Sequence, residues 1–359
     1  MNGKYKAFWL DDNKNVVVID QRLLPFEYET MTLKDADDAI FSIKDMVVRG
    51  AGVIGNIAAF GVYLAVKEND SMSYIKRKAQ EIRESRPTAV NLMWAVDIMM
   101  NALEKAKGNL LQTALEMAID ISDSDVKRSS LIGKFGCDKF EEIMSQNAKK
   151  SINVLTHCNA GWLAIVDDGS ALAPIYEAQR RGIDIHVWVD ETRPRNQGAN
   201  LTAWELEKSG IKHTVIPDNT GGYLMQQGMV DVCIVGADRV SAQGDVANKI
   251  GTYLKALAAH DNNIPFYVAI PEGTLDFNIV DGVKDIPIET RSEDEVKFIR
   301  GLNKDGKTQT LQIVPTASQS VNYGFDITPN RLVTGLITEK GICKANQNAI
   351  ETTFKKEKQ

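Results

Sequence analysis

The segment Ile152-Asn-Val-Leu-Thr-His-Cys-Asn-Ala-Gly161 is an apolar, β-favouring run that ends abruptly in polar residues and a glycine. Runs of this kind, bounded by turn residues, are typical of buried strands. Strands that alternate with helical sequence predict a parallel sheet with helices on both faces. The predicted strands are Ile152–Thr156, Ile183–Val189, His213–Ile216, Val230–Val235 and Phe266–Ile270. The predicted helices are Gly169–Arg181, Leu201–Ser209, Gly222–Gln227 and Val246–Asp261.

The first third of the chain has a different pattern. Phe8–Asp11 and Val16–Asp20 flank a polar turn and predict a hairpin. Thr32 begins a Ser/Thr-x-x-acid pattern that predicts the start of a capped helix, and Gly50 predicts its end. The almost wholly apolar residues from Val53 to Val66 predict a helix that is buried on all sides.

Two further helical stretches, Ser73–Ser85 and Thr88–Ala106, are separated by a break at Pro87. We therefore expect a mostly helical domain with a small antiparallel sheet over residues 1–125. We expect an α/β domain over residues 126–359, built on a Rossmann-like parallel sheet.

Composition excludes several classes of protein. The net charge of -6 over 359 residues argues against a nucleic-acid binder, which would show a basic face. We find no apolar run near the ~18 residues of a membrane span, and therefore expect no membrane contact. The four cysteines lie far apart without a CxxC pattern, which favours a reducing, cytoplasmic location over a disulfide framework or a zinc site.

Polar residues gather where the predicted strands end. In open α/β sheets, ligands bind outside the carboxyl ends of the strands, so four such ends in a row predict an active site. Cys158 lies just past the first strand, a position that favours a functional role. A free cysteine is more often a small hydrophobic residue, the interpretation we give Cys137, Cys233 and Cys343. Asp238 follows the fourth strand, where it could also cap a turn.

Several short motifs, taken together and in order, resemble those of the methylthioribose-1-phosphate isomerases. These enzymes share a fold with ribose-1,5-bisphosphate isomerases and with regulatory subunits of the eukaryotic exchange factor for initiation factor two. The resemblance covers about residues 5 to 343. Its carriers include Arg49-Gly-Ala-Gly-Val-Ile-Gly55, Arg86-Pro-Thr-Ala-Val-Asn91, Thr156-His-Cys-Asn-Ala-Gly161, Glu191-Thr-Arg-Pro194, Gln197-Gly-Ala199, Leu201-Thr-Ala-Trp-Glu-Leu206, Gly236-Ala-Asp-Arg239 and Gly244-Asp-Val-Ala-Asn-Lys-Ile-Gly-Thr252.

The resemblance implies that an aldose 1-phosphate becomes a ketose 1-phosphate, without metal or organic cofactor, in a homodimer. Because C1 carries phosphate, the sugar cannot open to a free aldehyde. The bond between C1 and the ring oxygen must break, and hydrogen must move from C2 to C1. Whether it moves through an enediol or as a hydride stays open.

The resemblance implies a catalytic pair, Cys158 and Asp238. Asp238 would protonate the ring oxygen, which requires a raised pKa that burial in an apolar pocket would supply. Cys158 would transfer a proton, either the one on C2 of the substrate or the one on the C2 hydroxyl. The substrate-binding positions implied by the resemblance are Arg49, Gly50, Ala51, Arg86, Gln197, Asn248 and Lys249.

The chain departs from the usual family pattern beside the cysteine. Trp162 stands where a small residue is usual, which leaves the C5 substituent of the substrate open. A 5-deoxyribose 1-phosphate isomerase is one alternative. A ribose-1,5-bisphosphate isomerase is another, with Arg195 available for a second phosphate. A non-catalytic regulatory subunit is disfavoured, because such subunits generally lack the Cys158 and Asp238 pair.

Overall fold

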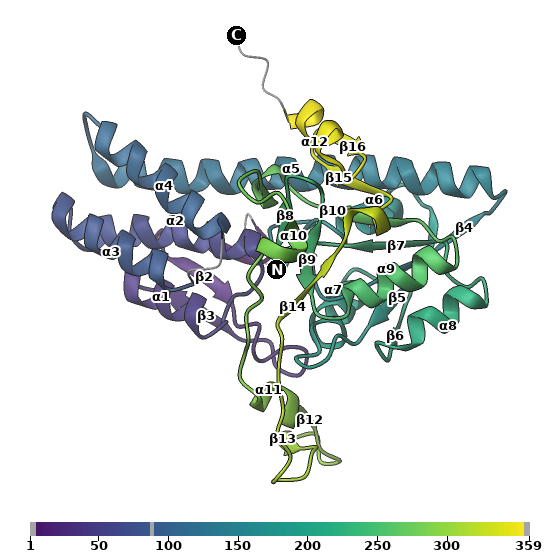
Figure 1. Cartoon of the computed structure of the whole chain (residues 1–359). Coiled ribbons are helices and arrows are strands. Elements are labelled where there is room, and N and C mark those ends of the chain that lie inside the picture. Colours follow the sequence, from purple (N-terminus) through teal and green to yellow (C-terminus); the bar gives the residue numbers. More distant parts are fainter. Residues whose placement is uncertain (1–4, 87–89, 355–359) are drawn as a thin grey trace. The chain divides into compact units, whose positions relative to one another are not determined.

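The computed structural model describes residues 5–86 and 90–354 (Figure 1). They fall into two compact units, and neither is continuous in sequence. Unit 1 comprises Met1–Leu23, Tyr28–Ser130 and Ala160–Leu172, and unit 2 comprises Leu24–Glu27, Leu131–Asn159 and Ala173–Gln359. The predicted break at Pro87 lies outside the described residues.

The small sheet of unit 1 is antiparallel, in the order β1 (Phe8–Leu10), β2 (Val16–Ile19) and β3 (Thr30–Leu33). The predicted hairpin is thus confirmed. All four residues of β2 are buried, because the strand lies in the middle of the sheet and against the helices.

The helices that begin in unit 1 are α1 (Ala36–Lys44), α2 (Ala51–Glu68), α3 (Met72–Glu84), α4 (Val90–Lys105) and α5 (Leu110–Gln146). The predicted cap at Thr32 is wrong. Thr32 pairs with Val17 in the sheet, and the helix is capped instead by Asp35, whose carboxylate accepts from the N–H of Asp38 at 2.8 Å. Gly50 does not end this helix but precedes α2 as its N-cap.

Helix α2 forms the centre of unit 1. Its residues Gly52 to Val66 are buried, as predicted, and pack with Phe8 and other side chains of the apolar core. The expectation of no membrane-length apolar run was wrong, because α2 is long and apolar enough by composition. However, 83% of the helix is buried inside the protein, so it is a core helix.

Unit 2 contains a seven-stranded sheet in the order β16-β15-β10-β7-β4-β5-β6. All neighbouring pairs are parallel except β15 with β16, so the predicted α/β class is confirmed. The strands are β4 (Ser151–Thr156), β5 (Asp184–Asp190), β6 (His213–Ile216), β7 (Val232–Val235), β10 (Phe266–Ala269), β15 (Gly335–Thr338) and β16 (Gly341–Cys343).

The connecting helices differ from prediction at two places. The helix predicted from Gly169 begins only at Ala173. The helix predicted from Val246 begins at Thr252, and Val246–Lys249 is instead a strand, β9. The helices are α6 (Ala173–Arg180), the π-helical turn η1 (Gly198–Thr202), α7 (Ala203–Lys208), α8 (Thr220–Gln226), α9 (Thr252–Asp261) and α12 (Gln347–Phe354).

Strand β9 belongs to a second, four-stranded sheet in the order β11-β8-β9-β14. It pairs antiparallel with β8 and with β14, which lies more than 70 residues later in the chain. The remaining elements include a separate hairpin, β12 with β13. The bounds are β8 (Arg239–Ser241), β11 (Leu275–Asp276), β12 (Phe298–Leu302), β13 (Thr308–Gln312), β14 (Phe325–Thr328), η2 (Glu272–Thr274), α10 (Gly282–Asp285), α11 (Asp294–Lys297) and η3 (Asn330–Leu332).

Candidate active site

Cys158 lies two residues beyond the end of β4, in an unusual backbone conformation. Its φ is +68°, in the left-handed region that non-glycine residues seldom adopt. Its side chain is buried, with 8% of the residue exposed. Strained conformations of this kind cluster at functional sites, because the surrounding structure must hold them in place. The position past a strand end, predicted from the sequence, is thus confirmed.

Cys137 and Cys233 differ from Cys158 in their surroundings. Both are completely buried, and Cys233 lies inside β7 as predicted. Burial raises the pKa of the Cys137 thiol to about 12 and raises the pKa of Cys233 as well. These thiols stay protonated and act as small apolar side chains.

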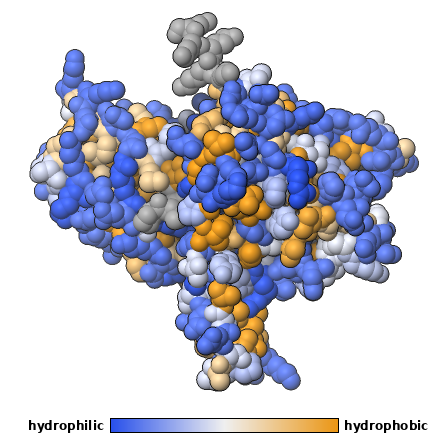
Figure 2. All heavy atoms as spheres, in the orientation of Figure 1, coloured by the Kyte–Doolittle hydropathy of each residue, from blue (hydrophilic) through white to orange (hydrophobic). Residues whose placement is uncertain are grey.

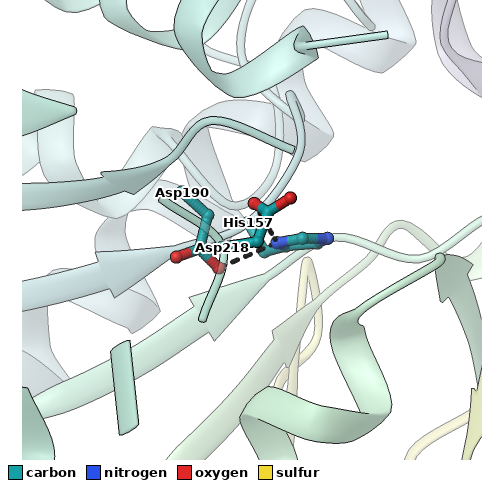
Figure 3. Close-up of side chains that lie close together, drawn as sticks. All are labelled: His157, Asp190 and Asp218. Atoms are coloured by element: carbon teal, nitrogen blue, oxygen red, sulfur yellow. Dashed lines mark hydrogen bonds and ion pairs between the residues drawn. The ribbon is translucent and has the colours of Figure 1, made fainter. Parts of the chain in front are cut away.

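His157 lies next to the carboxylates of Asp190 and Asp218 (Figure 3). Its Nδ1 is 2.8 Å from Asp190 Oδ2, and its Nε2 is 2.8 Å from the carbonyl oxygen of Ile250. A carbonyl oxygen only accepts, so Nε2 carries a hydrogen. Both ring nitrogens of His157 make hydrogen bonds. These bonds connect the end of β4 to the ends of β5 and β9. These contacts give His157 a structural role.

The same three side chains have the spacing of a metal site, since one ligand atom from each lies within 4.8 Å of the others. The contacts favour a hydrogen-bonded network instead. The ammonium of Lys255 lies 3.2 Å from Asp190 Oδ2, where it would repel a cation. The Asp218 carboxylate already accepts the N–H groups of Thr192 and Arg193, at 2.7 and 2.6 Å.

Asp190 is completely buried at the end of β5. Burial raises the pKa of its carboxyl, and the neighbouring His157 and Lys255 oppose that rise. Asp190 Oδ1 has no hydrogen-bond partner among the described residues. The carboxyl group thus contacts His157 and Lys255 through one oxygen only.

Gln197 follows β5 and precedes the π-helical turn. Only 5% of it is exposed, and its Oε1 has no hydrogen-bond partner in the described part of the chain. A buried amide oxygen without a donor costs free energy, typically about 1 to 3 kcal/mol. A ligand hydroxyl would satisfy it. The structure therefore gives a physical reason for the predicted substrate contact.

The second sheet holds three more of the predicted residues. Asp238 precedes β8, and its N–H donates to the carbonyl of Ala247 at 2.9 Å, beside Asn248 and Lys249 on β9. Asn248 and Lys249 are buried, whereas Asp238 is exposed. The burial expected for Asp238 is therefore absent from this structure.

Lys249 is a buried cation, with 6% of the residue exposed. Its Nζ donates to the carbonyl of Gly324 at 2.8 Å and lies 4.8 Å from the centre of the Phe325 ring. Asn248 donates to Thr252 Oγ1 at 3.0 Å, at the start of α9. A lysine held in this way can attract a phosphate without a large change of conformation.

The other predicted residues belong to unit 1. Arg49, Gly50 and Ala51 lie at the start of α2, and Arg86, which is half-buried, follows α3. The conformation of Gly50 serves the packing within unit 1. Its φ is +108°, and a β-carbon there would lie 2.5 Å from the carbonyl oxygen of Ala164.

Sequence reasoning missed two threonines that contact Cys158. Thr192 Oγ1 accepts the N–H of Cys158 at 2.8 Å, and Thr202 Oγ1 donates to its carbonyl at 2.6 Å. Both lie in motifs that carry the family resemblance, but nothing in those motifs indicates which main-chain atoms a hydroxyl will reach.

Comparison with known proteins identifies the family of the chain. Residues 47–345 match the initiation factor 2 subunit family. The chain belongs to this family. The resemblance predicted from the motifs is thereby confirmed.

Individual family members match almost the whole chain. A methylthioribose-1-phosphate isomerase of Sulfurimonas denitrificans is 61% identical, over 99% of this chain and 100% of that protein. The crystal structure of 5-methylthioribose 1-phosphate isomerase from Pyrococcus horikoshii has a TM-score of 0.84 at 34% identity, over 97% of this chain and 95% of its own. A structure described as translation initiation factor eIF-2B, subunit delta, from A. fulgidus has a TM-score of 0.82 at 35% identity. The match covers 97% of this chain and 98% of that chain.

Proposed function

We propose that this protein is a methylthioribose-1-phosphate isomerase, which converts 5-methylthioribose 1-phosphate to 5-methylthioribulose 1-phosphate in methionine salvage. The observation that carries the proposal is 61% identity over essentially the full length to a protein of that name. The strained, buried Cys158 at a strand end supports a catalytic rather than a regulatory protein.

In the proposed mechanism, Asp238 donates a proton to the ring oxygen as the C1–O bond breaks. A carboxyl group can serve as a general acid near neutral pH only when its pKa is raised. Asp238 is exposed in the free protein, so bound substrate has to supply the burial. On an enediol path, Cys158 takes the proton from C2 and returns it to C1, and the C2 hydroxyl proton passes to the Asp238 carboxylate. On a hydride path, the C2 hydrogen moves to C1 with its electron pair, and Cys158 takes the hydroxyl proton. In both cases the product carries a ketone at C2 and two hydrogens at C1.

We propose that cationic groups bind the phosphate, with Lys249, Arg49 and Arg86 in this role. The buried ammonium of Lys249 supports this, because a buried cation is strongly stabilised by an anion. Gln197 Oε1, which lacks a donor, would accept a hydrogen bond from a sugar hydroxyl. Asn248, Gly50 and Ala51 complete the proposed substrate contacts.

The test is an assay of purified protein without added metal. It compares kcat/KM for 5-methylthioribose 1-phosphate, 5-deoxyribose 1-phosphate and ribose 1,5-bisphosphate. A preference for the first substrate supports the proposal. A preference for either of the others assigns a different C5 group and contradicts it. The absence of turnover on all three would favour a non-catalytic role in translation initiation, the process named for the A. fulgidus relative.

A second measurement separates the two chemical pathways. The reaction is run in D2O, and the ketose product is examined by NMR. Deuterium at C1 supports an enediol, since solvent exchanges with the transferred proton. Retention of the original hydrogen supports a hydride shift, which requires no exchange.

We also propose a cytoplasmic homodimer. Four free cysteines, scattered over the chain, suit a reducing compartment. The hairpin β12–β13 exposes Phe298, Leu302 and Leu311, and Figure 2 shows apolar side chains on this arm. An isolated two-stranded hairpin is marginally stable, so a second copy of the chain would stabilise it. Sedimentation of wild type and Leu311→Glu tests this, with a dimer expected only for wild type.

A further inference from the structure

Both main-chain polar groups of Cys158 are bonded to threonine hydroxyls. The N–H donates to Thr192 Oγ1 at 2.8 Å, and the carbonyl accepts from Thr202 Oγ1 at 2.6 Å. Thr192 and Thr202 are completely buried. Neither threonine is part of the mechanism derived above.

Each hydroxyl has a fixed direction. Thr192 Oγ1 accepts from Cys158 and therefore donates to the carbonyl of Asp190, 3.0 Å away. Thr202 Oγ1 donates to Cys158 and accepts from Asn159 Nδ2, at 3.2 Å. A hydroxyl can make both kinds of bond at once, which a methyl group of the same shape cannot. Both positions therefore require a hydroxyl group and not only a side chain with the shape of threonine.

The groups that contact Thr192 are themselves held in place by further contacts. Asp190 is bonded to His157 at 2.8 Å and lies 3.2 Å from the ammonium of Lys255. Thr192 itself has a φ of +67°, which is costly for a β-branched residue. Its N–H donates to Asp218 Oδ1 at 2.7 Å, which helps to hold that conformation.

Thr202, which donates to the carbonyl of Cys158, is held in place in a similar way. Asn159 Nδ2, which donates to Thr202, also donates to Glu205 Oε1 at 2.9 Å. The second carboxylate oxygen, Glu205 Oε2, accepts from the hydroxyl of Tyr176 at 2.7 Å. Glu205 is completely buried in α7. Both threonine hydroxyls are therefore backed by buried hydrogen-bonded groups.

We propose that Thr192 and Thr202 are positioning residues, which hold the backbone of Cys158 in its left-handed conformation and thereby aim its thiol at the substrate. The proposal rests on the catalytic role of Cys158 in the proposed function. Without the two bonds, the backbone relaxes toward negative φ, because that region is lower in energy for a cysteine. The thiol then points in another direction.

The competing explanation is that the threonines only stabilise the fold. The two explanations differ in what happens to the molecules that stay folded. A purely stabilising role lowers the melting temperature but leaves kcat per folded molecule and the reactivity of the Cys158 thiol unchanged. A positioning role changes both.

The test replaces each threonine by valine, which keeps the shape and removes the hydroxyl, and by serine, which keeps the hydroxyl. Three quantities are measured: kcat and KM for 5-methylthioribose 1-phosphate, the melting temperature, and the rate at which iodoacetamide alkylates Cys158 between pH 6 and 9.5. Mass spectrometry of the Cys158 peptide separates its signal from that of Cys343. Thr192→Ala replaces Thr192→Val if the latter does not fold.

The chain offers a matched control in Thr328. This threonine is also completely buried, but its Oγ1 has no hydrogen-bond partner in the part of the chain that the structure describes. Thr328→Val removes a buried hydroxyl without removing a contact to Cys158. It should leave kcat and the alkylation rate at wild-type values.

For the valine variants we expect kcat to fall by about 100-fold with little change in KM, as for a misplaced catalytic group. The alkylation rate of Cys158 should change in the same variants, and the serine variants should recover both quantities. Folded valine variants with wild-type kcat and alkylation would overturn the proposal. The alkylation assay needs no substrate, so it tests the positioning of the thiol even if the proposed function fails.

Discussion

Gly198 lies so close to Asp190 that no side chain fits between them. A β-carbon on Gly198 would be 1.7 Å from the main-chain oxygen of Asp190 and 2.9 Å from Thr192 Oγ1. The contact brings the π-helical turn against the end of β5, next to the residues that hold Cys158. Glycine is required here by space, since no positive φ is involved.

We therefore predict that Gly198→Ala damages the site severely. The backbone must move by more than an ångström, and overpacking of this kind costs about 1 to 3 kcal/mol or more. Urea unfolding gives the free energy, and the turnover of the folded fraction should fall as well. Gly301→Ala is the control, because no described atom lies within 4 Å of its β-carbon position. Equal stability of the two variants would contradict the prediction.

Cys158→Ser tests the catalytic thiol. The two side chains are similar in size, so the variant should fold with a melting temperature close to that of wild type. Turnover should fall by at least about 100-fold, the range typical of a lost acid or base. Cys343→Ser, at a half-buried thiol in β16, should keep wild-type turnover. An active Cys158→Ser variant would remove the thiol from the mechanism.

Asp238→Asn tests the proposed acid. An amide cannot donate a proton to the ring oxygen as it leaves, so kcat should fall by about 100-fold or more. Because Asp238 is exposed, the melting temperature should hardly change. Asp305→Asn, at an exposed aspartate near the β12–β13 turn, is the control and should be fully active. Should the two variants turn over substrate equally fast, another group must act as the acid.

Local sequence patterns were sufficient for five of the seven strands of the main sheet in unit 2. The strand cores of β4, β5, β6, β7 and β10 were predicted, because each is a short run rich in β-branched, aromatic or other apolar residues between turn signals. Cys158 was also placed correctly past a strand end. These features depend on residues that are adjacent in sequence.

Features that depend on distant pairing were not predicted. Val246–Lys249 was assigned to a helix, but it forms a strand between β8, which precedes it closely in sequence, and β14, which lies more than 70 residues later. Thr32 was assigned as a cap, but it pairs with β2. The hydrogen bonds from Thr192 and Thr202 to Cys158 span 34 and 44 residues. Side-chain contacts at such separations have no period or spacing that a single sequence could reveal.

Stability at alkaline pH should depend on buried thiols. Burial raises the pKa of Cys137 from 9.0 to about 12. Below pH 9 the thiol is protonated in both folded and unfolded chains, so its contribution is fully present. As the pH rises from 9 toward 12, only the unfolded chain loses the proton, and the folded state loses stability. Between pH 8 and 10.5 the loss is about 2 kcal/mol for this thiol.

Urea unfolding of wild type and Cys137→Ala at the two pH values measures this effect. Other buried groups titrate equally in both proteins, so their contribution cancels. Wild type should lose about 2 kcal/mol more than the variant, although the variant is less stable at pH 8 because of the cavity. Parallel pH profiles would mean that the Cys137 thiol ionises as readily in the folded chain as in the unfolded one.

Lys249→Met tests the proposed phosphate contact. Methionine keeps the length and the apolar stem of lysine but removes the charge. It also leaves the carbonyl of Gly324 without the donor it has at 2.8 Å, so some loss of stability is expected. The loss of a charge-assisted bond to phosphate should reduce kcat/KM by roughly 10- to 100-fold, mostly through KM.

The control is Lys284→Met, since Lys284 is exposed and its ion pair with Asp281 at 2.6 Å lies within one short helix. That variant should match wild type in both kcat and KM. Inorganic phosphate provides a further check, because it should inhibit wild type competitively and inhibit Lys249→Met more weakly. If phosphate inhibits both equally and KM is unchanged, Lys249 has a structural role in joining β9 to the segment before β14, and the phosphate must be bound by other cations.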